Sequence, residues 1–260
     1  MDLRNTIYDM RQNIIITLLI IAVTIVSAKN RAGEKELVFK AGEALTYQVY
    51  YGPVNGGKAT VTVEQAVHAG KEVLHVKVLG YTTGLADKLF RVYDVYESYI
   101  DRETGLPVKA IRNVSEGNYR YYNEVLYNRE NNTVKSHRSG IVEVPDGIMD
   151  IVSAFYKLRD TMQVAEFQPY EVIGVDTYFK DKVFPVKVIF GGTETLETRL
   201  GSFNAIKLYP VSKPGKLFRS KNDITVWLSN DGNFVPRRVR MNMIVGSVMA
   251  DLIEYEGLRY

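Results

Sequence analysis

The sequence predicts a mainly β fold: a large curved antiparallel sheet or open barrel, made of two similar meanders around one central helix. Three observations support this fold class. Apolar and polar residues alternate through most of the chain after its N-terminal segment, which is the pattern of half-buried strands. One central segment carries apolar residues at helical spacing instead. A hairpin pattern with a turn glycine and a strand-initiating proline occurs twice, once on each side of that segment.

The composition bounds the class of protein before any motif is considered. The chain has 260 residues, of which 46% are hydrophobic and 24% are charged, enough for the core of one large domain. A net charge of +3 is too small to indicate a nucleic-acid-binding face, and we expect no nucleic-acid partner. The absence of cysteine excludes disulfides, thiol catalysis and cysteine-held metals.

The N-terminus has the pattern of an export signal. Two arginines precede the apolar run Ile14–Val26, which is shorter than the roughly 20 residues that a membrane span needs. The small residue Ala28 follows, and then the chain becomes polar. We predict a signal peptide at residues 1–28, cleaved after Ala28, and a single exported, periplasmic domain at residues 29–260. An uncleaved N-terminal anchor is the alternative.

The first half of the domain is predicted to be a β-meander. Its segments alternate in polarity, and glycine or asparagine turns separate them. The predicted strands are Ala44–Gly52, Lys58–Val67, Glu72–Gly80, Arg91–Ile100, Leu106–Val114 and Asn118–Asn128, followed by a short strand before residue 140.

The central segment is predicted to be an amphipathic helix over residues 147–162. Its apolar residues recur at spacings of three and four, and Asp146 is placed to accept hydrogen bonds from the first turn as an N-cap. The apolar positions are Ile148, Ile151, Val152, Phe155, Leu158 and Met162.

A second meander follows the helix. Pro107 and Pro236 each begin a strand after a polar, glycine-containing turn, so residues 44–140 and 169–257 read as a pseudo-repeat linked by the helix. General similarity among β-meanders is the alternative to duplication. The predicted strands are Tyr170–Phe179, Val183–Gly192, Thr193–Gly201, Phe203–Val211, Asp223–Asn230, Phe234–Gly246 and Ser247–Glu256.

Catalytic and cofactor motifs are weak in this chain. The G-x-x-x-x-G-K pattern at Gly52–Lys58 is followed by Ala59 and a strand, whereas a phosphate loop needs a hydroxyl residue and a helix. None of the three histidines sits in H-E-x-x-H or another close ligand pair, and no serine sits in G-x-S-x-G. We therefore expect no metal, no cofactor and no enzymatic activity, although a hydrolase that uses paired carboxylates stays open.

Two sets of residues are candidate binding sites. Apolar residues occupy both faces of the last predicted strands, which indicates either burial on both sides or an apolar cavity. The candidate cavity lining is Met241, Met243, Val245 and Met249, with Phe155 from the helix. The second set is a tyrosine-rich sheet face, with Tyr93, Tyr119 and Tyr121 as candidates for stacking on sugars. Cross-strand aromatic pairing explains the same tyrosines without a ligand.

Four stretches carry a resemblance to a known group of proteins: FKAGEALTYQVYYGPVNGGKATVTV, GLADKLFRVYDVYESYIDRETGLPVKAIRN, MDIVSAFYKLRD and TRLGSFNAIKLYP. They resemble a family of exported bacterial proteins that carry a domain of unknown function, over about residues 38–257. The matching motifs are structural and imply no catalytic residue. A looser likeness to lipoprotein-carrier half-barrels implies a curved sheet around a helical plug and a lipophilic ligand.

We therefore expect an exported, non-enzymatic protein that binds a lipid-like or amphiphilic ligand in the concave face of its sheet. A glycan-binding surface module is one alternative. An envelope scaffold that binds a protein partner and no small ligand is the other.

Overall fold

The computed structural model describes residues 36–211 and 223–260, so the expected signal peptide and its cleavage site lie outside the described part. Within that part, one antiparallel sheet has 14 strands in the order β8-β7-β6-β5-β4-β3-β2-β1-β14-β13-β12-β11-β10-β9. The elements are β1 (Ala44–Tyr51), β2 (Val54–His68), β3 (Lys71–Thr82), α2 (Gly84–Leu89), β4 (Val92–Asp101), β5 (Pro107–Glu116), β6 (Tyr119–Asn128), β7 (Thr133–Ser136), β8 (Gly140–Glu143), α3 (Ile151–Val164), β9 (Val172–Phe179), β10 (Lys182–Thr198), β11 (Gly201–Pro210), β12 (Ile224–Ser229), β13 (Pro236–Asn242) and β14 (Ser247–Glu256).

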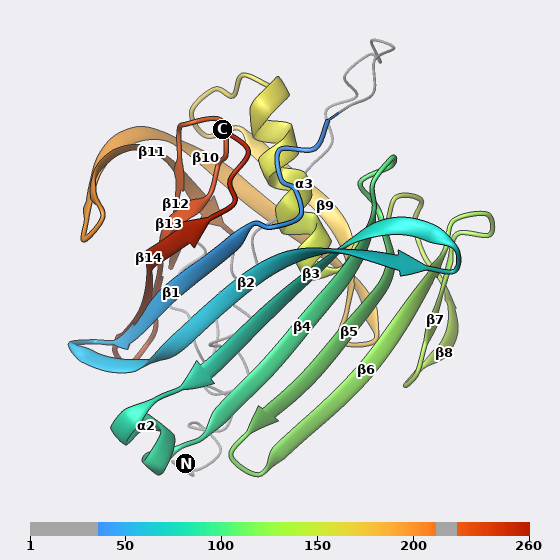
Figure 1. Cartoon of the computed structure of the whole chain (residues 1–260), viewed down its shortest axis with the longest axis horizontal. Coiled ribbons are helices and arrows are strands. Elements are labelled where there is room, and N and C mark those ends of the chain that lie inside the picture. Colours follow the sequence, from blue (N-terminus) through green and yellow to red (C-terminus); the bar gives the residue numbers. More distant parts are fainter. Residues whose placement is uncertain (1–35, 212–222) are drawn as a thin grey trace.

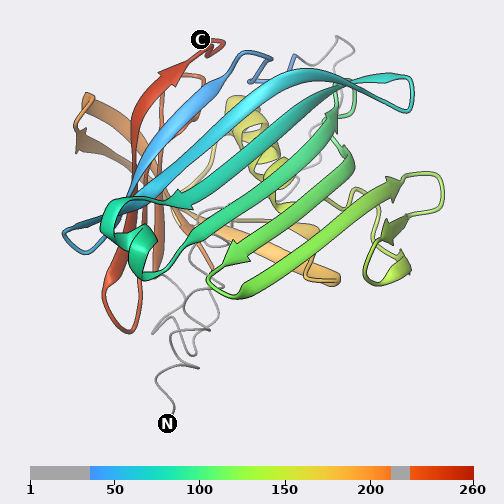
Figure 2. The same ribbon diagram turned by 60° about the horizontal axis from the view of Figure 1, so that its bottom comes forward.

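The sheet consists of two meanders that meet at the first and last strands. Strands β1–β8 and β9–β14 each follow chain order, and β1 joins them by pairing with β14 from Ala44 opposite Glu256 to Tyr51 opposite Val248. The outermost strands, β8 and β9, do not pair with each other, so the sheet stays open. It curves around α3, which runs through its concave side (Figures 1 and 2). The predicted mainly β, curved antiparallel sheet is confirmed.

The two proline-marked hairpins occupy corresponding places in the meanders. In β4–β5, Pro107 pairs with Ile100, and in β12–β13, Pro236 pairs with Leu228; each proline lies next to a shift in strand register. Proline suits a strand start of this kind because no ladder N–H is needed there. The shared geometry agrees with the pseudo-repeat, while duplication itself stays a prediction.

Helix α3 begins four residues later than the sequence predicts. The expected bounds were 147–162 with Asp146 as N-cap; the helix spans Ile151–Val164, and Asp150 caps it. The Asp150 carboxylate accepts from the backbone N–H groups of Val152 and Ser153, at 2.8 and 3.1 Å. The segment before it cannot be helical, because Gly147 has a φ of 68° and Met149 forms a parallel bridge to Thr177 on β9.

Replacing Asp150 by Ala should destabilise the fold by about 2 kcal/mol, at the upper end for an N-cap, because this carboxylate also accepts from Ser98 on β4 at 2.7 Å. The exposed Asp146 gives a matched control, and Asp146→Ala should change stability by less than about 0.5 kcal/mol. Urea unfolding of both variants measures the difference. Equal losses would show that the cap assignment is incorrect.

Both flanks of α3 are buried, not only its apolar side. Arg159 forms a two-pronged ion pair with Glu43, at 2.6 and 2.7 Å, and neither side chain is exposed. The Tyr156 hydroxyl donates to the same carboxylate at 2.9 Å, and the Arg159 Nε donates to the carbonyl of Asn233 at 2.9 Å. These contacts fix the helix to the start of β1 and to the β12–β13 turn.

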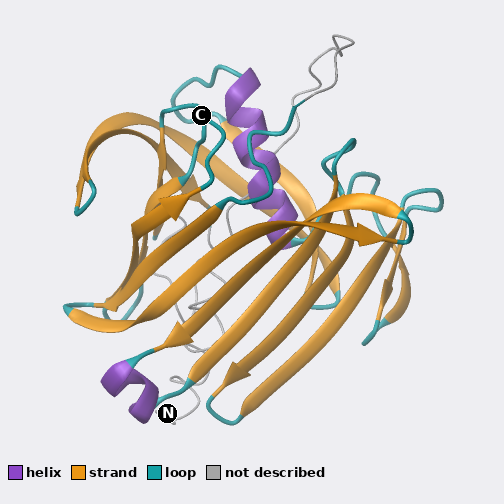
Figure 3. Cartoon of the chain, viewed as in Figure 1, coloured by secondary structure: helices purple, strands orange, loops and turns teal. Residues whose placement is uncertain are grey.

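The short helix α2 was not predicted, since six residues are too few to show a helical period. It links β3 to β4 at one end of the sheet (Figure 3). In the described residues, neither helix has the length and apolar character that crossing a membrane requires.

Candidate functional site: an apolar cavity under the sheet

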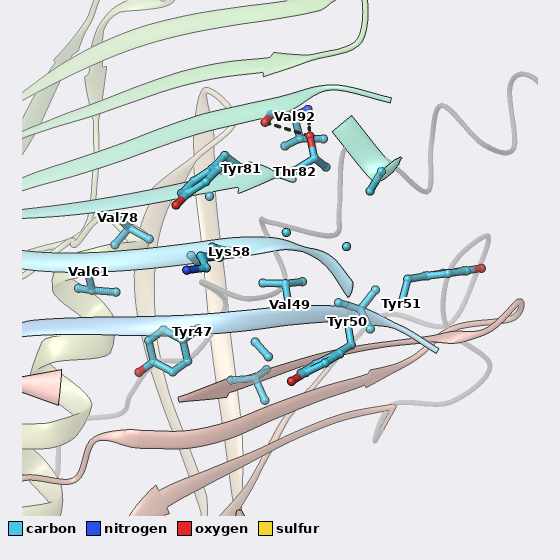
Figure 4. Close-up of a pocket in the computed structure, with 18 of the residues that line it drawn as sticks. Tyr47, Val49, Tyr50, Tyr51, Lys58, Val61, Val78, Tyr81, Thr82 and Val92 are labelled. Carbon is cyan, nitrogen blue, oxygen red and sulfur yellow. Dashed lines mark hydrogen bonds between the residues drawn. The ribbon is translucent and has the colours of Figure 1, made fainter. Parts of the chain in front are cut away.

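A cavity of about 480 Å³ lies between the concave face of the sheet and α3. This volume is within the range of small-molecule sites, about 300–1,000 Å³. Strands β1, β2 and β3 form one wall, β13 and β14 another, α3 the inner end, and α2 borders the outer end (Figure 4). The main inward residues are Leu45, Tyr47, Val49, Ala59, Val61, Val78, Val152, Phe155, Val239, Val248 and Ala250.

The cavity has a closed inner end and an open mouth. Along β1, the inward side chains become steadily more exposed, from Leu45 at 1% and Tyr47 at 6% to Tyr51 at 39%. Figure 4 shows Tyr47, Val49 and Tyr51 following one another along this strand. The mouth therefore lies at the β1–β2 turn and α2, and a long molecule can enter there and run inward toward α3.

The lining carries almost no reactive groups. Lys58 is its one charged residue, and the residues that line it include no serine, histidine or carboxylate. In the described part of the chain, no group of three or more histidine or acidic side chains could hold a metal ion. Such a surface gains its binding free energy from removing apolar area from water, at roughly 25 cal/mol per Å².

The structure places the five candidate lining residues in different environments. Phe155 lines the cavity. Met241 and Met243 are 1% and 7% exposed and lie in the hydrophobic core, whereas Val245 is 59% exposed in the β13–β14 turn. Met249 is half-buried.

The choice of face on β14 is thereby corrected. Alternation along the sequence predicts that Met241, Met243, Val245 and Met249 share one face. The structure has a turn at residues 243–246, which separates β13 from β14. In the resulting ladder, Met241 lies opposite Val248 and Val239 opposite Ala250. The inward face therefore passes from odd-numbered residues on β13 to even-numbered residues on β14, and Val248 and Ala250 line the cavity in place of Met249.

The missed wall residues had a signal in the sequence. Leu45, Tyr47 and Val49 alternate along β1, as Ala59 and Val61 do along β2. This period of two places them on one face. It cannot distinguish a face that packs fully from one that leaves a cavity.

A second, polar group lies deeper along the same concave face, beside a small cavity of about 40 Å³. Arg112 is 9% exposed, and its guanidinium carbon lies 4.5 Å from the ring centre of Tyr121 and 5.0 Å from that of Phe179. Its Nε donates to the Tyr96 hydroxyl at 3.2 Å. The aromatic rings thus shield a buried cation, which is a stabilising arrangement.

Two buried carboxyl groups accompany Arg112. Asp94 is fully buried and Glu116 is 2% exposed, and the two carboxyl groups lie close enough for each to shift the pKa of the other. Burial, reinforced by the charge of Asp94, raises the pKa of Glu116 to about 9. Burial also raises the pKa of Asp94. Neither carboxyl is among the residues that line the two cavities described above.

The candidate glycan-stacking tyrosines do not share a face. Tyr93 is 48% exposed and points to the convex side, because its neighbours Val92 and Asp94 are turned inward. Tyr119 and Tyr121 pack against the core, and the Tyr121 hydroxyl donates to Asp181 at 3.2 Å. Sequence alternation within each strand cannot show this, since the relative face of β4 and β6 depends on their register with β5.

Known proteins resemble the chain in fold. A β-barrel-like protein of the domain of unknown function DUF1849, from Brucella abortus, is similar over 84% of this chain and 98% of that chain, with a TM-score of 0.55 and 9% identity. A protein from Bacteroides fragilis, described as exported and YmcC-like in fold, is similar over 86% of this chain and 100% of that chain, with a TM-score of 0.39 and 11% identity. No curated protein matches.

At 9% identity, the likeness to the DUF1849 structure shows a shared fold and nothing about function. The match to a family is more specific. Residues 46–253, which run from the third residue of β1 to the seventh residue of β14, match the family described as proteins of unknown function, DUF3108, and the chain belongs to that family.

Proposed function

We propose that this protein is an exported, non-enzymatic carrier that holds a lipid-like or amphiphilic molecule by its apolar chain in the cavity under the sheet. The observation that carries the proposal is the cavity itself: about 480 Å³, open at one end and lined almost wholly by apolar side chains. A flexible alkyl chain fits this geometry, because it can enter at the mouth and extend toward Phe155 while its polar end stays in water. The export signal expected at residues 1–28 supports a periplasmic location.

Ligand chemistry can be tested with a series of alkyl glucosides that differ only in chain length. Each methylene buried contributes about 0.8 kcal/mol, so the affinity should rise about fourfold for each one added until the chain fills the cavity. Free glucose oligomers are the control, since a glycan module would bind them. Isothermal titration calorimetry gives both affinities, and recognition of the sugar without dependence on chain length would overturn the proposal.

Filling the cavity should abolish this binding. Ala59 is half-buried on the inward face of β2, and Ala59→Trp places a large ring among the wall residues. Thr60→Trp is the matched control, because the next residue on a strand points to the opposite face. We expect at least a tenfold loss of affinity for alkyl glucosides in the first variant and little change in the second. Thermal unfolding of both variants separates a filled cavity from a fold that has been lost.

Native mass spectrometry of the protein purified from its own host tests occupancy directly. Bound amphiphile should appear as added mass that organic extraction removes. Repeated recovery of empty protein, together with failure to bind any alkyl glucoside, would leave the carrier function without support.

A further inference from the structure

The mouth of the cavity is surrounded by apolar side chains that face solvent. Leu85 and Leu89 on α2 are 67% and 78% exposed, and Val54 on β2 is 52% exposed. The β13–β14 turn adds Val245, which adjoins Tyr51 because the Tyr51 hydroxyl donates to the Val245 carbonyl at 3.2 Å. We call these five residues the apolar rim. Single exposed apolar residues are ordinary, whereas a group gathered around an opening marks a contact surface.

Helix α2 is attached through polar contacts, and its leucines take no part in them. The Thr82 hydroxyl donates to the Asp87 carboxylate at 2.9 Å and accepts from the backbone N–H of Val92 at 2.8 Å. No residue of this helix is buried. Leu85 and Leu89 therefore stay exposed at the mouth, because the position of α2 does not depend on burying them.

Cations lie beside the apolar rim. Lys88 and Arg91 are exposed on and just after α2. The neighbouring β5–β6 turn contributes the exposed Arg120, and this turn is joined to the same place by a hydrogen bond from Gly117 N–H to the Arg91 carbonyl at 2.8 Å. The one carboxylate of α2, that of Asp87, is half-buried and lies 4.0 Å from the Arg91 Nε. The surface around the leucines is therefore apolar at its centre and positive at its border.

We propose that the apolar rim docks onto the surface of a bilayer that contains anionic phospholipid, with the cavity mouth against the membrane. The leucines and Val54 would enter the boundary between headgroups and acyl chains, while Lys88, Arg91 and Arg120 contact lipid phosphates. This inference rests on the proposed carrier function, because the docked mouth lets an alkyl chain pass between membrane and cavity without crossing water.

The position of the opening favours a membrane over a protein partner or a second copy of the chain. Four of the five rim residues also line the cavity, namely Tyr51, Val54, Leu85 and Leu89, so a protein docked on the rim would close the mouth. A fluid bilayer offers alkyl chains at that same place. The positive border also complements the negative charge of anionic headgroups.

The absence of native cysteine allows a site-specific test with the full chain. Leu89→Cys, labelled with an environment-sensitive nitrobenzoxadiazole probe, should show a blue shift and a gain in intensity on addition of vesicles of phosphatidylglycerol and phosphatidylethanolamine. Val67→Cys is the matched control: Val67 is 70% exposed at the opposite end of β2, and its probe should not respond. Equal responses at both sites, or no response at Leu89, would overturn docking through the rim. Tethering of the protein by its N-terminal segment alone would give one of these two results.

The charge contribution has its own matched pair. Lys88→Gln with Arg91→Gln should lower vesicle affinity about fivefold for each cation removed. Lys71→Gln with Arg102→Gln removes the same charge from exposed residues at the other end of the sheet and should leave affinity unchanged. Equal losses of vesicle affinity in both double variants would show that the net charge of the protein, and not a docking face, determines binding.

Cavity filling distinguishes docking from ligand uptake. In the Ala59→Trp background the Leu89 probe should still respond to vesicles, although alkyl glucosides no longer bind. If the response disappears, the probe was reporting a lipid inside the cavity, and docking is refuted while the carrier function stands. If vesicles shift the emission of the probe but no alkyl glucoside binds the parent chain, the carrier function is refuted and docking through the apolar rim stands. A shift that grows with protein concentration in the absence of vesicles would assign the rim to a second copy and refute the proposal.

Discussion

Replacing Glu43 by Gln should lower the free energy of unfolding by about 3–5 kcal/mol. The substitution keeps the shape of the side chain but removes the charge that faces the fully buried Arg159. A buried cation that loses its partner pays its full desolvation cost, with no Coulombic attraction to offset it. The variant also weakens the acceptor of the Tyr156 hydroxyl. Urea unfolding, followed by circular dichroism, measures the loss.

The matched control is Glu36→Gln. Glu36 pairs with Arg259, but its side chain is 72% exposed, and exposed pairs contribute at most about 1 kcal/mol. Replacing both buried partners, with Glu43→Leu and Arg159→Met, should cost less than the sum of the two single changes, because neither charge is then left alone. If Glu43→Gln costs no more than Glu36→Gln, the ion pair does not hold α3 in the sheet.

Raising the pH should destabilise the protein through Glu116. Burial raises its pKa from the ordinary 4.5 to about 9, so between these values the folded chain keeps a proton that the unfolded chain releases. Stability is therefore greatest below about pH 4.5 for this group and falls as the pH rises through about 9, with a slope of up to about 1.4 kcal/mol per pH unit. Urea midpoints measured across this range give the slope.

Glu116→Gln should flatten that dependence and make the protein more stable than the parent chain at pH 8. The amide carries no titrating proton, and it can donate to Asp94 at every pH. Glu254→Gln, at an exposed position on β14, is the control and should leave the slope as it is in the parent. A parent chain whose stability does not fall between pH 6 and 9 would contradict the assignment of a protonated Glu116.

The fold was largely accessible from the sequence because its signals are local. Alternation along each strand depends only on the period of a strand, and the spacing from Ile148 to Met162 depends only on the period of a helix. The helix start was misplaced because Asp146 and Asp150 are both reasonable caps. The choice between them depends on a bridge from Met149 to β9, which no local pattern reveals.

The site was less accessible because its determinants are distant in the chain. Glu43 and Arg159 lie far apart in sequence and carry no spacing that links them. The turn after Met243 exchanges the inward face of the last two strands, and the register of β5 puts Tyr93 and Tyr121 on opposite sides of the sheet. Each of these depends on which strands pair, and a single sequence does not specify that pairing.

The junction between β1 and β14 also constrains the order of assembly. During synthesis, β1–β8 can form by pairing each strand with the one before it, but the other edge of β1 has no partner until the last strand emerges. A long, unpaired edge is prone to join other chains. The nascent protein therefore passes through an aggregation-prone stage, which ends only when β14 has been synthesised and pairs with β1. Loss of β14 would leave this edge of β1 permanently unpaired, even with every other strand in place.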